Sequence, residues 1–192
     1  MQTSFVALLA LSAGVLASPS APAPTHAFTC KDANEGFAWS MTLFEYKATE
    51  VSTTPAHQNV DGEVSFNISN PALLSLQSSS GCSGSSVQYP DYFYGNIVYE
   101  CIDPRIDTNT KTTFTYDAPS GLLSINQTWT CPDAKDPVSF FAAGSVNLTL
   151  TTSKTSYSNP DWKMGQTYAS KTAISTGPSL VPITAFHISA VV

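Results

Sequence analysis

The sequence predicts an all-β domain, folded as an antiparallel β-barrel or β-sandwich in a single compact unit. The first observation is that apolar residues recur at every second position, as in Val64, Phe66 and Ile68, with Ser or Asn between them. This period of two is typical of strands with one buried face and one solvated face. The second is the abundance of Thr, Val, Tyr and Phe in runs separated by Ser, Gly, Pro and Asn. The third is that no segment of ten or more residues shows a helical stripe.

Eight strands follow from this pattern when the chain is taken in order. The expected strands are residues 37–50, 62–69, 92–102, 111–117, 121–131, 138–151, 163–174 and 180–190. The later core-facing residues are Leu123, Ile125, Trp129, Val146, Leu148 and Leu150. Short antiparallel strands at this spacing are typical of both sandwiches and barrels, so the choice between them stays open.

The clearest hairpin is the segment TTFTYDAPSGLLSINQTW, residues 112–129. Pro119 suits the turn, and Gly121 can adopt the positive φ that such turns require. The sequence therefore predicts two paired strands around residues 117–121.

The first 27 residues have a composition unlike the rest of the chain. Residues 1–17 hold an uncharged apolar run that ends in small residues, which predicts a signal peptide cleaved after Ala17. Residues 18–27 are rich in Pro and Ala and predict a short tether, and residues 28–192 form the domain. We therefore expect a secreted, extracellular protein without a membrane anchor, because the apolar tail LVPITAFHISAVV lacks the polar spacer of a lipid-anchor signal.

Four cysteines are present, Cys30, Cys82, Cys101 and Cys131, and none forms a CxxC motif. An even number in a secreted chain favours disulfides over a metal site. Three pairings are possible. The local pair Cys82–Cys101 is favoured because a flexible Ser/Gly-rich loop flanks Cys82, and this pairing leaves Cys30 with Cys131.

Three N-x-S/T sequons predict N-linked glycans. Asn67, Asn126 and Asn147 each fall on the polar phase of an expected strand, where a bulky glycan can project outward. The alternative is that they are ordinary outward-facing polar residues. We expect a glycan on at least one of them.

Charge and motifs exclude several classes of function. The net charge is −6 and the cations are scattered, so no cluster exists that could displace counterions from nucleic acid. No catalytic, nucleotide-binding or metal-binding motif occurs, so we assign no catalytic residue, metal or cofactor. His57, Asp61 and Glu63 could bind a metal or transfer a proton, but a polar turn leading into a strand has the same residues.

Aromatic residues are concentrated in the segment YPDYFYGNIVY, residues 89–99. Exposed rings could stack on sugars or planar phenolics, and Tyr89, Tyr92 and Tyr94 are the candidate ligand-binding residues. Packing of these tyrosines inside a barrel explains the same pattern.

The order of these elements resembles the Alternaria major allergen family of small secreted fungal proteins. The resemblance rests on Cys30, the following FAWSMTLFEY segment, VSFNISNP, the Cys82–Cys101 pair, and SGLLSINQTWTC followed by GSVNLTL. It covers the chain from about Cys30 to Leu150 and implies a compact β-barrel without established catalytic residues.

The resemblance also implies a role as an allergen, and as an elicitor or effector that binds plant defence proteins or small phenolics. Cys30 matches by position the cysteine that joins two subunits in that family. Because this chain has an even cysteine count, we expect a monomer, with a covalent dimer as the alternative. The function expected is a non-catalytic binder of a host protein or small aromatic ligand. The alternatives are a wall-active enzyme or carbohydrate-binding module, and a structural surface protein.

Overall fold

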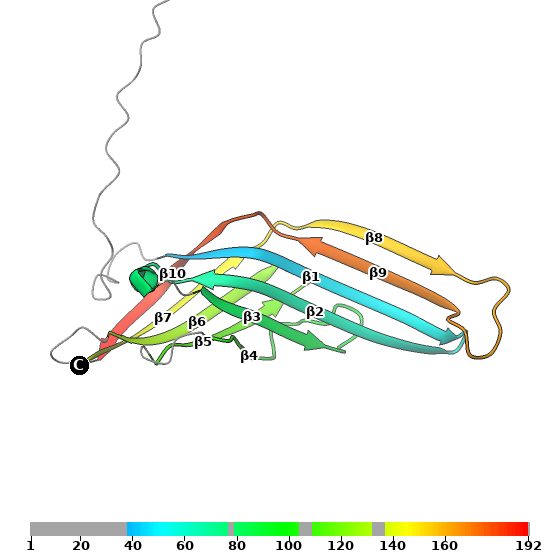
Figure 1. The fold of residues 1–192 in the computed structure, drawn as a ribbon, viewed down its shortest axis with the longest axis horizontal. Coiled ribbons are helices and arrows are strands. Elements are labelled where there is room, and N and C mark those ends of the chain that lie inside the picture. The colour runs from blue at the N-terminus through cyan, green and yellow to red at the C-terminus, as the bar shows by residue number, and fades with distance from the viewer. Residues whose placement is uncertain (1–37, 77–78, 104–108, 132–136, 192) are drawn as a thin grey trace, which may run out of the picture.

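The computed structural model describes residues 38–76, 79–103, 109–131 and 137–191, and these form a nearly closed antiparallel β-barrel in one compact domain (Figure 1). The strands are β1 (Ala38–Thr54), β2 (His57–Ser69), β3 (Ser79–Ser86), β4 (Tyr99–Glu100), β5 (Lys111–Asp117), β6 (Leu122–Cys131), β7 (Val138–Asn147), β8 (Thr151–Ser158), β9 (Ala169–Thr176) and β10 (Val181–Val191). One short 3-10 helix, η1 (Pro71–Leu76), follows β2. The all-β prediction is confirmed, and the barrel is the form adopted.

The strand order around the barrel is β3-β2-β1-β10-β7-β6-β5-β4. β1 is long enough to pair with two strands along one edge, β10 over residues 38–41 and β9 over residues 45–52. β8 pairs with β9 and with no other strand among the described residues. Four strands, β8, β9, β1 and β2, therefore extend beyond the barrel as a sheet (Figure 1).

The alternating residues pack as the sequence predicts. Val64, Phe66 and Ile68 on β2 are buried, as are Leu123, Ile125 and Trp129 on β6. Edge-to-face ring contacts, such as Phe66 with Phe114 at 4.9 Å and Phe44 with Tyr116 at 5.4 Å, fill the interior. The β5–β6 hairpin is confirmed, and Gly121 has a φ of 70°.

Three of the expected strands are substantially shorter in the structure. Residues 92–102 contain only the two-residue strand β4, because Tyr92 and Gly95 adopt positive φ angles that an extended strand does not allow. The expected strand 138–151 ends at Asn147, and β8 begins at Thr151. The expected strand 163–174 begins at Ala169, since a turn that contains Gly165 at φ 91° precedes it.

The Ser/Gly-rich segment around Cys82, expected to be a loop, is strand β3. Its residues have little intrinsic strand propensity, but β2 offers a complete hydrogen-bonding edge over residues 62–69. Pairing with a neighbouring strand therefore overrides local propensity here.

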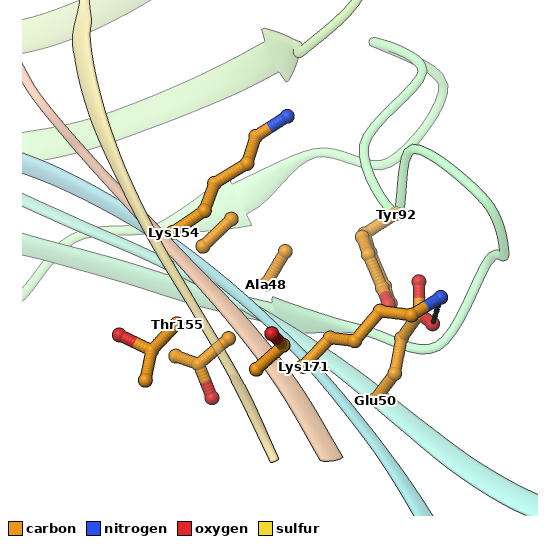
Figure 2. Close-up of a pocket in the computed structure, with 9 residues that line it drawn as sticks. Ala48, Glu50, Tyr92, Lys154, Thr155 and Lys171 are labelled. Carbon is orange, nitrogen blue, oxygen red and sulfur yellow. Dashed lines mark hydrogen bonds and ion pairs between the residues drawn. The ribbon is translucent and has the colours of Figure 1, made fainter. Parts of the chain in front are cut away.

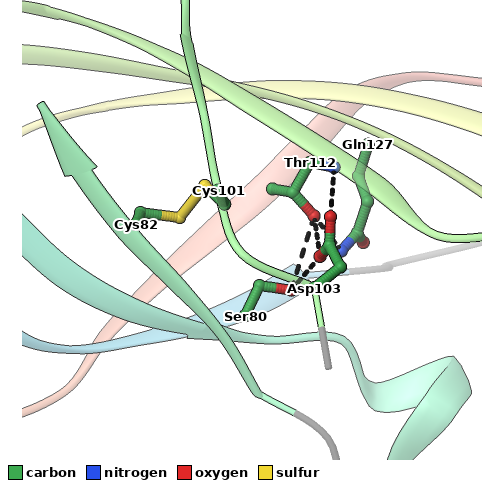
Figure 3. Close-up of a disulfide and its surroundings, with 6 residues drawn as sticks. All are labelled: Ser80, Cys82, Cys101, Asp103, Thr112 and Gln127. Carbon is green, nitrogen blue, oxygen red and sulfur yellow. Dashed lines mark hydrogen bonds between the residues drawn. A yellow bond between two sulfur atoms is a disulfide. The ribbon is translucent and has the colours of Figure 1, made fainter. Parts of the chain in front are cut away.

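A disulfide closes the barrel where its two end strands meet (Figure 3). Cys82 on β3 bonds to Cys101, which follows β4, as expected from the sequence. Beside it, Gly81 and Ile102 exchange two backbone hydrogen bonds of 3.0 and 2.7 Å. Among the described residues, one isolated bridge pairs the two sides of this seam, and the disulfide adds a covalent link beside it.

A polar cluster lies on the interior side of the seam (Figure 3). The carboxylate of Asp103 accepts hydrogen bonds from the Ser80 hydroxyl, the Thr112 amide at 2.8 Å and the Thr112 hydroxyl at 2.8 Å. The Gln127 amide donates to the Thr112 hydroxyl at 2.8 Å. These bonds tie the segment after β4 to β3, β5 and β6.

Gln127 continues the polar cluster across the core. Its carbonyl oxygen accepts from Trp39 Nε1 and from Asn70 Nδ2, each at 2.7 Å. Asn70 in turn accepts the Ala72 amide at 2.8 Å, which caps the start of η1. A buried amide with these partners is well satisfied and fixes the positions of β1, β6 and η1.

Candidate functional site

The three candidate tyrosines lie in the segment between β3 and β4, and they differ in exposure. Tyr89 is 55% exposed and Tyr94 is 39% exposed, whereas Tyr92 is only 2% exposed. Tyr89 packs edge-on against Tyr92, with ring centroids 6.4 Å apart, and the Tyr94 hydroxyl lies 3.4 Å from the Asp91 carboxylate. Tyr92 is therefore packed against the sheet and lines a surface hollow.

The hollow lies over one row of residues that crosses the four extended strands. Lys154 on β8 pairs with Ala173 on β9, Ala173 with Ala48 on β1, and Ala48 with Gly62 on β2. Residues paired in this way project on the same face of the sheet. The Tyr92 ring covers Gly62, and the short side chains of the two alanines leave a depression between Tyr92 and Lys154.

Tyr92 forms one wall of the hollow and Lys154 the other (Figure 2). The Tyr92 ring lies directly against Gly62, where an added Cβ would be 2.5 Å from the Tyr92 Cβ. The Lys154 ammonium extends from β8 and makes no ion pair with any residue in the described ranges. The volume between them is about 350 Å³, which suits a small molecule.

A second lysine, Lys171, lies on β9 two residues from Ala173 and pairs with Glu50 on β1. The Lys171 ammonium is 3.3 Å from the Glu50 carboxylate, so these two charges largely compensate each other (Figure 2). Lys154 is consequently the uncompensated charge of the hollow. A ligand that carries a negative charge would find its complement there.

The Tyr92 phenol faces this region in its neutral form. Burial raises the pKa of Tyr92, and the negative charges of Glu50 and Asp61 raise it further. Its hydroxyl lies 3.4 Å from the Thr49 carbonyl oxygen, to which it donates. Tyr92 therefore offers a ligand an apolar ring held in a fixed position, and it carries no charge.

Another hollow, of about 680 Å³, lies along the edge of β3 and holds three carboxylates, Glu45, Glu63 and Glu100. All three side chains are exposed to solvent. Glu63 lies 3.7 Å from the Lys47 ammonium and Glu100 lies 2.9 Å from the Lys111 ammonium. Two of the three carboxylates in this hollow thus have a lysine as an ionic partner, and all three face solvent.

The residues of the predicted polar turn, His57, Asp61 and Glu63, lie on β2 and are exposed. Glu63 is engaged by Lys47, and Asp61 pairs in register with Thr49. Within the described ranges, no three His, Cys, Asp or Glu side chains come together as metal ligands would. The region looks like an ordinary solvated strand.

The three sequon asparagines differ in their surroundings. Asn126 on β6 and Asn147 at the end of β7 are exposed, and Asn67 on β2 is half-buried. Cys131 is buried and is not a free thiol. Cys30 lies outside the described residues, as do the predicted signal peptide and tether, so the Cys30–Cys131 bond stays a prediction.

The lysine of the hollow was missed by sequence reasoning. The residues of this row are far apart in sequence, with more than 100 positions between Ala48 and Lys154. They come together only through the register of four strands. Ala48 and Ala173 carry no local signal of a binding floor, and Gly62 carries none of its contact with Tyr92.

The protein is thus a small β-barrel that is closed by a disulfide and carries a surface hollow on its extended sheet. The chain belongs to the Alternaria alternata allergen 1 family, whose model matches residues 41–163, more than half of its length. No curated protein and no solved structure gives a significant match. No described helix is long and apolar enough to cross a membrane.

The match ends before β9 and β10, yet both strands belong to the same fold. β10 lies between β1 and β7 and completes the barrel wall, and β9 supplies Ala173 and Lys171 to the hollow. Residues beyond position 163 are therefore part of the domain and of its candidate site.

Proposed function

We propose that this member of the allergen family is a secreted, non-catalytic binding protein that takes a small phenolic acid in the hollow beside Tyr92. The observation that carries the proposal is the pairing of an aromatic wall with an uncompensated cation across a floor that contains Ala48 and Ala173. A planar ring would lie over the floor, and its carboxylate would contact Lys154. The disulfide and the family are consistent with an extracellular location.

The exposed carboxylates support binding over hydrolysis. The general acid of a glycosidase is typically held away from water or beside a like charge. Glu63 and Glu100 instead lie beside lysines in solvent. A wall-active enzyme is therefore the less favoured function.

A second candidate is binding of a host protein, as expected for an effector. The supporting observation is β8, all eight residues of which are exposed. β8 is an edge strand of the extended sheet, with its outer backbone groups available to an added strand. This role would use the strand edge rather than the hollow.

Calorimetric titration with 4-hydroxycinnamate tests the main proposal. We expect saturable binding, and we expect Lys154→Met to weaken it about tenfold because one charged contact is lost. The neutral analogue 4-hydroxycinnamyl alcohol should bind the native protein and the Lys154→Met variant equally.

Lys163→Met is the matched control. Lys163 is an exposed lysine in the turn between β8 and β9, and it is not among the residues that line the hollow. This variant should bind the acid as the native protein does. Absence of saturable heat, or equal losses in both variants, would refute the proposed site.

A further inference from the structure

An apolar surface lies beside the disulfide seam, next to the sequon at Asn67. A hollow of about 330 Å³ is lined by Leu43, Phe66, Asn67, Gly81, Cys82 and Ile102, among others. Leu43 is 73% exposed and Ile102 is 77% exposed. Two large aliphatic side chains exposed at the rim of one hollow form an apolar surface of the kind that often contacts another group.

The backbone holds Leu43 outward at an energetic cost. Its φ of 57° lies in the left-handed region, which leucine rarely adopts. The residue sits in a bulge, where the register with β2 shifts between Thr42 and Glu45. Strain of this kind in an exposed leucine indicates a local role for its side chain.

Asn67 lies between the two aliphatic residues. On one side it pairs with Thr42, the neighbour of Leu43 in the bulge. On the other side it pairs with Gly81, which forms an isolated bridge to Ile102. The sequence of positions across the sheet is thus Thr42, Asn67, Gly81 and Ile102.

Gly81 leaves space beside the asparagine. The nearest atom to a Cβ placed on Gly81 would be Asn67 Oδ1, at 3.9 Å. Because this position carries no side chain, a group attached to the Asn67 amide has room to lie over β3 towards Ile102. The disulfide beneath this position involves Cys82, the next residue along β3.

We propose that Asn67 carries an N-linked glycan whose first N-acetylglucosamine packs in this hollow, between Leu43 and Ile102. Asn67 begins the sequon Asn67-Ile68-Ser69. The first sugar is attached to the amide nitrogen, and its C–H face and acetyl methyl are apolar surfaces. Their contact with the two aliphatic side chains removes apolar area from water and stabilises the seam.

The chain contains its own comparison site. Asn126 is exposed on β6, where its paired neighbours are Thr113 on β5 and Ala143 on β7. Neither is a large exposed aliphatic residue. A sugar on Asn126 would extend into solvent with little to contact.

The experiment uses protein secreted from yeast with a single sequon retained. Asn126→Gln with Asn147→Gln leaves Asn67 only, and Asn67→Gln with Asn147→Gln leaves Asn126 only. Endoglycosidase H then trims each glycan to one N-acetylglucosamine, and a variant with all three asparagines changed to Gln is the reference. We expect the single sugar on Asn67 to raise the Tm by about 2–4 °C, and the one on Asn126 by less than about 1 °C.

Removal of the apolar contacts tests the mechanism. In a background of Leu43→Asn with Ile102→Ser, the Tm increment from the Asn67 sugar should disappear, because the sugar then has no apolar partners. The comparison is made within one background, so a general loss of stability cancels. The proposal is overturned if secreted protein is unoccupied at Asn67, if both sites give equal increments, or if the increment persists in this background.

Discussion

Gly62 on β2 lies directly beneath the Tyr92 ring, and a methyl group at position 62 would approach the Tyr92 Cβ to 2.5 Å. This contact joins the segment between β3 and β4 to the extended sheet. It also fixes the aromatic wall of the hollow.

We therefore expect Gly62→Ala to displace Tyr92 and to lower the free energy of unfolding by about 1–3 kcal/mol, as overpacking does. Urea denaturation measures the loss. Gly81→Ala is the matched control on the next strand, since its added Cβ meets nothing closer than 3.9 Å. Equal effects of the two substitutions would contradict the packing of Tyr92 on Gly62.

Replacement of the seam disulfide by Cys82→Ala with Cys101→Ala should destabilise the protein by about 3 kcal/mol, because the bond closes a loop of 19 residues. Hydrogen exchange should locate the effect. The Gly81 and Ile102 amides, which donate across the seam, should lose protection, and amides of the β6–β7 ladder should not. Unchanged protection at Gly81 and Ile102 would show that backbone pairing alone closes the barrel.

Gln127→Leu should cost about 3 kcal/mol in urea denaturation. The substitution removes three buried hydrogen bonds, to Trp39, Asn70 and Thr112, each worth about 1 kcal/mol. Thr128→Ser, at the exposed position next on β6, keeps the Asn126 sequon and should change the stability by less than about 0.5 kcal/mol. A loss near zero for Gln127→Leu would mean that an apolar core is equally good at this point.

Stability should fall at alkaline pH. Burial raises the pKa of Tyr116 to about 12, and it also raises the pKa of Tyr46. Between the ordinary tyrosine pKa of about 10 and these higher values, the unfolded chain releases protons that the folded chain retains. The tyrosine contribution is therefore complete below pH 10 and is lost as the pH rises towards 12.

Tyr116→Phe separates this effect from general alkaline denaturation. The Tyr116 hydroxyl has no hydrogen-bond partner within the described residues, so its removal should leave stability at pH 7 unchanged or slightly higher. The fall in unfolding free energy between pH 9 and pH 11.5 should become shallower. An identical pH profile would assign the alkaline loss to other groups.

Peptide mapping without reduction should recover Cys30 joined to Cys131 within one chain, and non-reducing electrophoresis should show a monomer with no free thiol. The reason is that the Cys82–Cys101 bond leaves one possible intrachain partner for each remaining cysteine. A dimer that dissociates on reduction would instead assign Cys30 to a bond between subunits.

Much of the fold could be predicted because it depends on local alternation. The buried phases of β2 and β6 were evident in Val64, Phe66, Leu123 and Ile125, and the β5–β6 turn was evident from Gly121. β3 could not be predicted, since its serines and glycines form a strand only when the β2 edge is present. β8 could not be predicted either, because all of its residues are exposed and it therefore shows no alternation of apolar and polar positions.

The fold class, the candidate disulfide Cys82–Cys101 and the sequons could be predicted from the chain, because each depends on residues that are close to one another in sequence. Two features became evident only in the folded protein: the barrel closes at Gly81 and Ile102, and Lys154 faces Tyr92 across two alanines. Only the structure placed Asn67 between Leu43 and Ile102. The physical reason is strand register: hydrogen bonding between strands sets which distant residues share a row, and no local pattern records that choice.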